Sequence, residues 1–207
     1  ACVMPLPTFL IIGAPKSATT SLARYLAQHP DVFLSNPKEP HFLAFHREKP
    51  SFRGVHAERE WLNINAVTTF AGYRALFDNA GAATAIGEAS TNYLYFEETV
   101  NGIRTHLPDV RMIAILRNPV DRAFSSFEHL LRDKRETVAD FRHALELEER
   151  RIAENWSPLY RYVDVGRYAD QIERYYAAFG RDRLKVVLYD DLRKDPEGTL
   201  ADLLAFI

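Results

Sequence analysis

Short apolar runs alternate with amphipathic stretches along this chain. The runs that predict buried strands are residues 8–13, 31–34, 84–87, 111–116 and 184–189. The stretches with helical spacing are residues 19–28, 70–76, 99–106, 120–133, 138–153 and 168–179, with Pro196 opening a last helix. This alternation indicates an α/β fold with a mostly parallel central sheet flanked by helices.

Residues 37–65 break the alternation. They mix aromatic, basic and proline residues without a clear period, which predicts a long loop region over a site. No linker or repeat divides the chain, so we expect a single domain spanning residues 1–207. The amphipathic pattern of the last helix still runs at Ile207. We therefore expect this domain to lack a C-terminal part.

Composition and charge narrow the class of protein. Lys and Arg number 26 against 28 Asp and Glu, a net charge of -2, which argues against a nucleic-acid partner. The single cysteine, Cys2, excludes an internal disulfide. The longest apolar run, residues 9–12, is far shorter than the ~20 residues of a membrane helix, and no cationic leader precedes it. We expect a cytoplasmic protein, or a soluble domain of a larger one, with no membrane segment.

Candidate chemistry first appears between the first strand and the first helix. Residues 13–21 read G-A-P-K-S-A-T-T-S, which places Lys16 and a cluster of hydroxyls at a helix N-terminus. Unpaired N–H groups, the helix dipole and a lysine together form an anion site. The alternative is that the hydroxyls cap the helix and Lys16 is solvated.

The loop does not match the nucleoside-triphosphate pattern G-x-x-x-x-G-K-[ST]. That pattern requires a glycine directly before the lysine, whereas Gly13 lies three residues before Lys16. A kinase that uses ATP and Mg²⁺ is therefore the second hypothesis, with Asp190 at a strand end as its metal-binding group. A nucleotide-binding module without activity is the third.

Three separated stretches share the pattern of one family. They are K-S-A-T-T-S-L at 16–22 followed by His29-Pro30, K-E-P-H-F at 38–42, and L-R-N-P-V-D-R-A-F-S at 116–125. Together they resemble the sulfotransferases that use 3'-phosphoadenosine 5'-phosphosulfate (PAPS). Their spacing is most similar to the heparan sulfate N- and 3-O-sulfotransferases and their bacterial relatives, and residues 165–168 and 188–192 extend the match.

The resemblance implies a P-loop-like three-layer domain and a reaction. A sulfuryl group would pass from PAPS to a hydroxyl or amine, leaving adenosine 3',5'-bisphosphate (PAP), without a metal. The acceptor would be a glycan or a small metabolite. The aromatic and basic residues of the loop region are candidates for its pocket, namely Phe45, His46, Arg47, Phe52, Arg53, His56 and Trp61.

The resemblance also assigns roles to donor-binding residues. Lys16 would stand beside the bridging oxygen of the 5'-phosphosulfate. The rest of this loop would bind the phosphate, and its members are Ser17, Ala18, Thr19, Thr20 and Ser21. The family usually has glycine where this chain has Ala18. Arg117 and Ser125 would bind the 3'-phosphate, in keeping with the bidentate fit of a guanidinium to phosphate.

The K-E-x-H-F pattern assigns the catalytic base. Glu39 takes that role, and His41 is the second choice. A carboxylate beside Lys38 and His41 can be held ionised and oriented for proton abstraction. The alternative is a Glu39 that pairs with a lysine on a solvated loop. His106, in T-H-L-P, resembles the histidine base of small-molecule sulfotransferases, but its position predicts a helix terminus instead.

Overall fold

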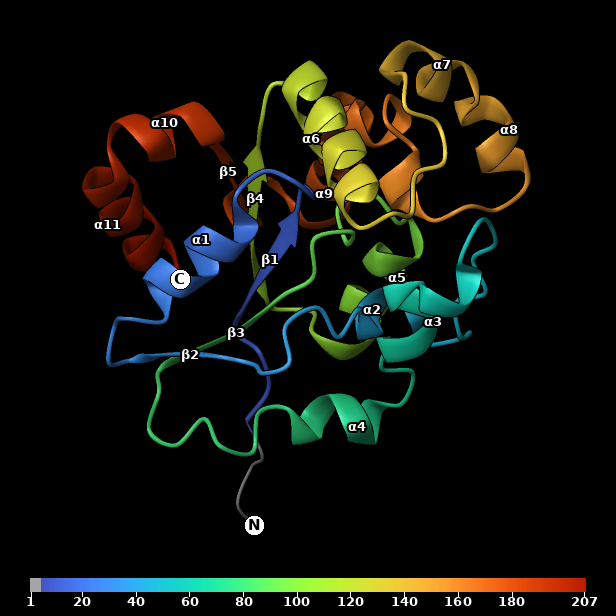
Figure 1. Cartoon of the computed structure of the whole chain (residues 1–207). Coiled ribbons are helices and arrows are strands. Elements are labelled where there is room, and N and C mark those ends of the chain that lie inside the picture. The colour runs from blue at the N-terminus through green and yellow to red at the C-terminus, as the bar shows by residue number, and fades with distance from the viewer. Residues whose placement is uncertain (1–4) are drawn as a thin grey trace.

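A parallel sheet forms the centre of the computed structural model, which describes residues 5–207 (Figure 1). Its five strands lie in the order β2-β3-β1-β4-β5, and every pairing between them is parallel. Their bounds are β1 Phe9–Gly13, β2 Val32–Leu34, β3 Ala85–Ala89, β4 Arg111–Leu116 and β5 Leu184–Leu188. The predicted α/β class and parallel sheet are confirmed. Cys2 lies outside the described residues.

Helices cover both faces of the sheet because its strands are apolar on both sides. In β1, Phe9 and Ile11 point into one core cluster, whereas Leu10 and Ile12 point into another. Around the first cluster lie α1 Thr19–Leu26, α10 Tyr189–Lys194 and α11 Pro196–Phe206. Around the second lie α2 Phe42–Phe45, α4 Phe70–Ala75, α5 Glu98–His106 and α9 Tyr168–Phe179. The result is the predicted three-layer arrangement.

A third cluster of apolar residues lies beyond the sheet. Ala123, Phe127 and Leu130 of α6 (Pro119–Arg132) pack there with Tyr160 and Tyr162. Two short helices, α7 (Phe141–Glu146) and α8 (Glu148–Ala153), complete this part of the molecule (Figure 1).

The single helix predicted over residues 138–153 is wrong. Asp140 caps α7 by accepting the His143 N–H at 2.8 Å, so the helix begins later than predicted. After Leu147 the chain begins α8, whose Glu148 carboxylate accepts the backbone N–H groups of Val163 and Asp164. These tertiary contacts outweigh the helical periodicity that motivated the prediction.

The segment predicted as a long loop is also more structured than its composition indicates. It contains α2, a 3-10 turn at Ala57–Arg59 and α3 (Trp61–Asn65). Gly102 of α5 explains how α2 docks, because a Cβ at this position would lie 2.1 Å from the carbonyl oxygen of Leu43. The missing side chain lets α2 pack directly on α5, and α2 begins immediately after His41.

A polar group lies inside the core on β3. The side chain of Glu88 is fully buried, and its carboxylate accepts hydrogen bonds from Tyr73 Oη at 3.2 Å and Ser90 Oγ at 2.8 Å. Burial raises the pKa of Glu88 to about 7, against the lowering effect of its hydrogen bonds. The network therefore contains a carboxyl group that titrates near neutral pH.

Within residues 5–207, the helices are all too short or too polar to cross a membrane.

Candidate active site

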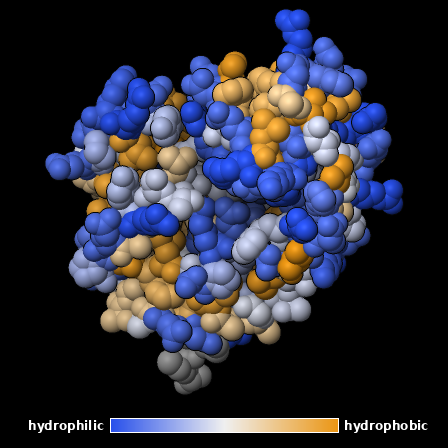
Figure 2. Space-filling model, in the orientation of Figure 1, coloured by the Kyte–Doolittle hydropathy of each residue, from blue (hydrophilic) through white to orange (hydrophobic). Residues whose placement is uncertain are grey.

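The carboxyl ends of the parallel strands meet at one edge of the sheet, where a cavity of about 740 Å³ opens. Figure 2 shows a hydrophilic hollow near the middle of this face. Residues that follow β1, β3, β4 and β5 line this cavity, as expected for ligand sites in open α/β sheets. The residues that line it are Pro15, Lys16, Ala18, Thr19, Thr20, Lys38, Glu39, His41, Arg59, Glu60, Trp61, Leu62, Thr91, Asn92, Arg117, Ser125, His129, Asp133, Arg135, Pro158, Leu159 and Tyr189.

The loop after β1 curls tightly at the cavity wall. Lys16 and Ala18 both adopt left-handed backbone conformations, with φ of 67° and 65°. Such conformations cost non-glycine residues roughly 1–2 kcal/mol each and are concentrated at functional sites. Burial lowers the pKa of Lys16, and the positive charges of Arg132 and Arg117 lower it further. The loop thus holds a partly desolvated cation beside the N-terminus of α1.

A second cationic group stands at the end of β4. Arg117 donates from Nη1 to the carbonyl oxygen of Lys16 at 3.4 Å, and its guanidinium carbon lies 5.1 Å from the centroid of the Tyr189 ring. Ser125, on α6, lines the same cavity. The guanidinium and the phenol ring are therefore in contact, and the Ser125 hydroxyl lines the same cavity.

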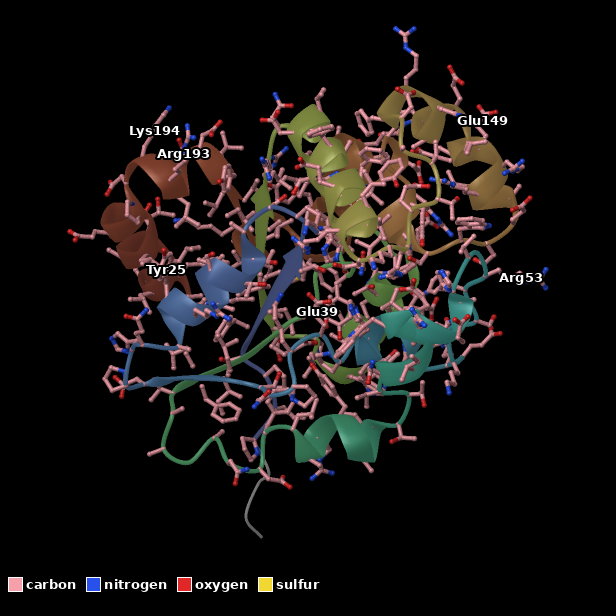
Figure 3. All side chains as sticks on the ribbon, in the orientation of Figure 1. Tyr25, Glu39, Arg53, Glu149, Arg193 and Lys194 are labelled. Atoms are coloured by element: carbon pink, nitrogen blue, oxygen red, sulfur yellow. The ribbon has the colours of Figure 1, made fainter. Side chains whose placement is uncertain are left out.

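Glu39 presents a carboxylate to the cavity. Its backbone is left-handed at φ 64°, and its N–H donates to the Ala89 carbonyl oxygen at 3.0 Å, which ties it to the end of β3. Oε1 accepts from Lys38 Nζ at 2.9 Å and from Thr91 Oγ1 at 3.4 Å. The side chain is 26% exposed, and Glu39 is labelled near the middle of the view in Figure 3.

The surroundings of Glu39 keep it ionised. Burial alone would raise its pKa, but a hydrogen bond and the charge of His41, together with Lys38, lower it to about 2. The His41 Nε2 atom lies 3.5 Å from Glu39 Oε2. At neutral pH the carboxylate is therefore an acceptor only, available to take a proton.

His41 itself is enclosed. Its side chain is 0% exposed, between the rings of Phe45 and Tyr93 at centroid distances of 6.4 and 5.9 Å. Both residues line the cavity, but the His41 side chain is fully buried, whereas the Glu39 side chain is 26% exposed. The geometry favours Glu39 over His41 as the group that contacts a ligand.

Most of the predicted site residues come together. Lys16, Ala18, Thr19, Thr20, Glu39, His41, Arg117 and Ser125 share this one cavity, although they come from separate stretches of the chain. The other two hydroxyls of the loop point elsewhere. Ser17 is fully buried beneath the loop, and Ser21 is exposed on α1 outside the cavity lining.

The sequence interpretation missed several lining residues. His129 follows Ser125 by four positions on α6 and therefore shares its helix face, a spacing that could have identified it. Burial and the charge of Lys16 lower the pKa of His129. Thr91, which follows β3, and Arg135, which follows α6, carry no motif that marks them.

Two alternatives lose support from the geometry. Asp190 follows the end of β5 by two residues, in the first turn of α10, and its exposed side chain is 3.8 Å from Arg193. His106 ends α5, where its ring packs 5.0 Å from Phe42 and 4.9 Å from Phe70. Both side chains lie outside the cavity lining.

Comparison with known proteins identifies the family. The profile described as "Sulfotransferase family" matches residues 7–207. The chain belongs to the sulfotransferase family. A crystal structure of a sulfotransferase from Alicyclobacillus acidocaldarius matches with a TM-score of 0.92 and 41% identity, covering 98% of this chain and 81% of that one.

Two curated mouse proteins are more distant relatives of this sulfotransferase chain. Bifunctional heparan sulfate N-deacetylase/N-sulfotransferase 4 from Mus musculus is 29% identical, with 98% of this chain and 22% of the relative covered. Heparan sulfate glucosamine 3-O-sulfotransferase 3B1 from Mus musculus is 27% identical, with coverages of 98% and 46%. The chain thus spans less than half the length of either.

The left-handed conformation of Ala18 leads to a stability prediction. Ala18→Gly should leave the free energy of unfolding unchanged or raise it by up to about 1 kcal/mol, because relief of strain offsets the added entropy of the unfolded chain. The matched control is Ala23→Gly, in the interior of α1, which should lower it by about 1 kcal/mol. Urea denaturation measures both. Equal destabilisation by the two substitutions would contradict the loop conformation described above.

Proposed function

We propose that this chain transfers a sulfuryl group from PAPS to a hydroxyl or amine of an acceptor, releasing PAP. One observation carries the proposal: a single cavity combines a lysine-bearing anion loop, a separate arginine and serine pair, and an ionised carboxylate. A nucleotide with phosphates at both its 5' and 3' positions needs two anion sites, which we assign to the Lys16 loop and to Arg117 with Ser125. Membership of the sulfotransferase family supports the same reaction.

The loop after β1 would bind the 5'-phosphosulfate. Lys16 supplies a charge, and the N–H groups at the start of α1 supply donors directed at the same point. Thr19 and Thr20 add hydroxyls from the cavity wall. At the sheet edge, Arg117 and Ser125 would bind the 3'-phosphate, with the guanidinium held over the Tyr189 ring.

In the transfer step the acceptor oxygen or nitrogen forms a bond to sulfur as the bond between sulfur and the bridging phosphate oxygen breaks. Negative charge then collects on that phosphate oxygen, where Lys16 stabilises it most. The acceptor loses a proton as its bond to sulfur forms. Glu39 accepts this proton. A weak base is sufficient, because the proton becomes more acidic as positive charge develops on the acceptor atom.

The acceptor would enter beside α3. Trp61 is 46% exposed at the cavity, and Arg59 and Arg135 also line it, although the Arg135 guanidinium donates to the Glu60 carboxylate. An exposed indole offers a flat apolar face, which suits the apolar face of a sugar ring, and the guanidinium groups suit hydroxyls or acidic substituents. Two relatives carry heparan sulfate in their names, so we propose a glycan acceptor.

Of the aromatic and basic residues suggested for this pocket from sequence, Trp61 is the one that reaches the cavity. Phe45 and Phe52 instead pack around Phe96. The proposed acceptor surface is therefore narrower than the loop region as a whole.

Replacement of the base tests the reaction. Glu39→Gln keeps the shape of the side chain and removes the proton acceptor, so we expect transfer of radiolabelled sulfate from PAPS to fall about 100- to 10,000-fold. Affinity for PAP, measured by calorimetry, should stay within a few-fold. The control is Glu97→Gln, a carboxylate 84% exposed on the surface, which should retain activity.

Because the pKa of Glu39 is about 2, its protonation should not limit the rate until the pH approaches that value. An unimpaired Glu39→Gln enzyme would remove this residue from the mechanism. If the wild-type chain transfers no sulfate to any hydroxyl or amine, the proposed function itself is wrong.

The acceptor class has its own test. Wild-type protein should sulfate desulfated heparan-type oligosaccharides in preference to simple phenols. Trp61→Ala should raise the KM for the oligosaccharide by about tenfold, since loss of an aromatic contact costs roughly 1.4 kcal/mol, while the KM for PAPS stays unchanged. A preferred phenolic acceptor, with no effect of Trp61→Ala, would contradict the glycan proposal.

A further inference from the structure

The segment that carries Glu39 has an unusual backbone. Glu39 and His41 are both left-handed, with φ of 64° and 53°, and Pro40 lies between them. Residues hold such conformations only where the surroundings enforce them. Two hydrogen bonds attach this segment to the end of β3, from Glu39 N–H to the Ala89 carbonyl oxygen and from His41 N–H to Ser90 Oγ, each 3.0 Å long.

The second of these bonds depends on a side chain. Ser90 is fully buried, and its hydroxyl donates to Glu88 Oε2 at 2.8 Å. With its proton directed at Glu88, the oxygen of Ser90 keeps its lone pairs free to accept the His41 N–H. A continuous path therefore runs from Glu88 through Ser90 and the His41 backbone to the Glu39 segment.

We infer that Glu88 and Ser90 are positioning residues, which fix the direction of the Glu39 carboxylate through the backbone of His41. The inference rests on the proposed function, in which Glu39 is the base. Glu88 and Ser90 lie outside the residues that line the cavity, so they act through His41 and not on a ligand.

Protonation of Glu88 changes the hydrogen bonds along this path. The titratable groups around its carboxyl are Tyr73 from α4, Tyr93 from the segment after β3, and Glu39, whose negative charge adds to the effect of burial in raising the pKa of Glu88. The ionised carboxylate can only accept, so Ser90 must donate to it. The protonated form can itself donate to Ser90, and the orientation of the hydroxyl is then no longer enforced.

Tyr73 provides a matched control. Its hydroxyl donates to the other oxygen of the same carboxylate, Oε1, at 3.2 Å. The tyrosine is fully buried, like Ser90, but it belongs to α4 and makes no link in the path to His41. Tyr73→Phe therefore removes a hydrogen bond to Glu88 without touching the Ser90 contact.

The test compares Ser90→Ala, Glu88→Gln and Tyr73→Phe by kcat and by PAP affinity. Ser90→Ala should lower kcat about 10- to 100-fold, the loss expected from a misplaced catalytic group. PAP affinity should stay within about twofold, because the donor loop is untouched. Tyr73→Phe should keep kcat within about threefold of wild type. In the wild type kcat should rise with pH through about 7, and in Glu88→Gln this rise should be absent.

Unfolding midpoints test whether Glu88 is the group with the raised pKa. The folded-state pKa of Glu88 is about 7, above the usual value of 4.5, so the folded form binds more protons between these values. The wild-type midpoint should therefore fall as pH rises from about 5 to about 8, and the fall should be smaller in Glu88→Gln.

Two results would overturn the inference: a folded Ser90→Ala protein with wild-type kcat, or a Tyr73→Phe protein that loses as much kcat as Ser90→Ala. If Ser90→Ala does not fold, a Glu88→Gln protein with wild-type kcat and pH profile overturns it instead. These outcomes differ from failure of the proposed function, in which Glu39→Gln itself would be unimpaired.

Discussion

The arrangement depends on one constraint, the convergence of parallel strands at a single edge. Because β1, β3, β4 and β5 all point the same way, the residues that follow each strand must meet there. Lys16, Thr91, Arg117 and Tyr189 are far apart in sequence, and each follows a different strand. The Glu39 carboxylate lines the same cavity as the cations Lys16 and Arg117. Its ionised form is stabilised by two neighbours on its own segment, His41 and Lys38.

Backbone strain is the second feature of the site. Lys16, Ala18, Glu39 and His41 are all left-handed, and they lie on the two segments that border the cavity. Packing elsewhere in the fold sustains these conformations. On the Glu39 side, Gly102 allows α2 to dock closely, and the hydroxyl of Ser90 holds His41, the residue that precedes this helix. Rigid support of this kind keeps a catalytic group in position without reorganisation during the reaction.

The sequence predicted the strands well, because buried parallel strands are continuous apolar runs, and it placed a loop correctly between β1 and α1. The sequence predicted the structure less well where contacts between distant residues determine it. Glu148, which begins the second of the two helices found between residues 138 and 153, bonds to the backbone N–H groups of Val163 and Asp164. The side chains of Ser17 and Ser21 turn away from the cavity, which a motif of consecutive hydroxyls does not reveal. Glu88 gave no signal, because a lone glutamate in a short strand does not disclose its burial.

Calorimetric comparison of nucleotides tests the central claim most directly, namely that the cavity holds two separate anion sites for one donor. PAP should bind more tightly than ATP with Mg²⁺. Arg117→Ala should weaken PAP binding by about 10- to 100-fold, the equivalent of a lost hydrogen bond to a charged group, and should affect adenosine 5'-phosphate much less. Tighter binding of ATP with Mg²⁺, together with an Arg117→Ala protein that binds PAP normally, would contradict the account.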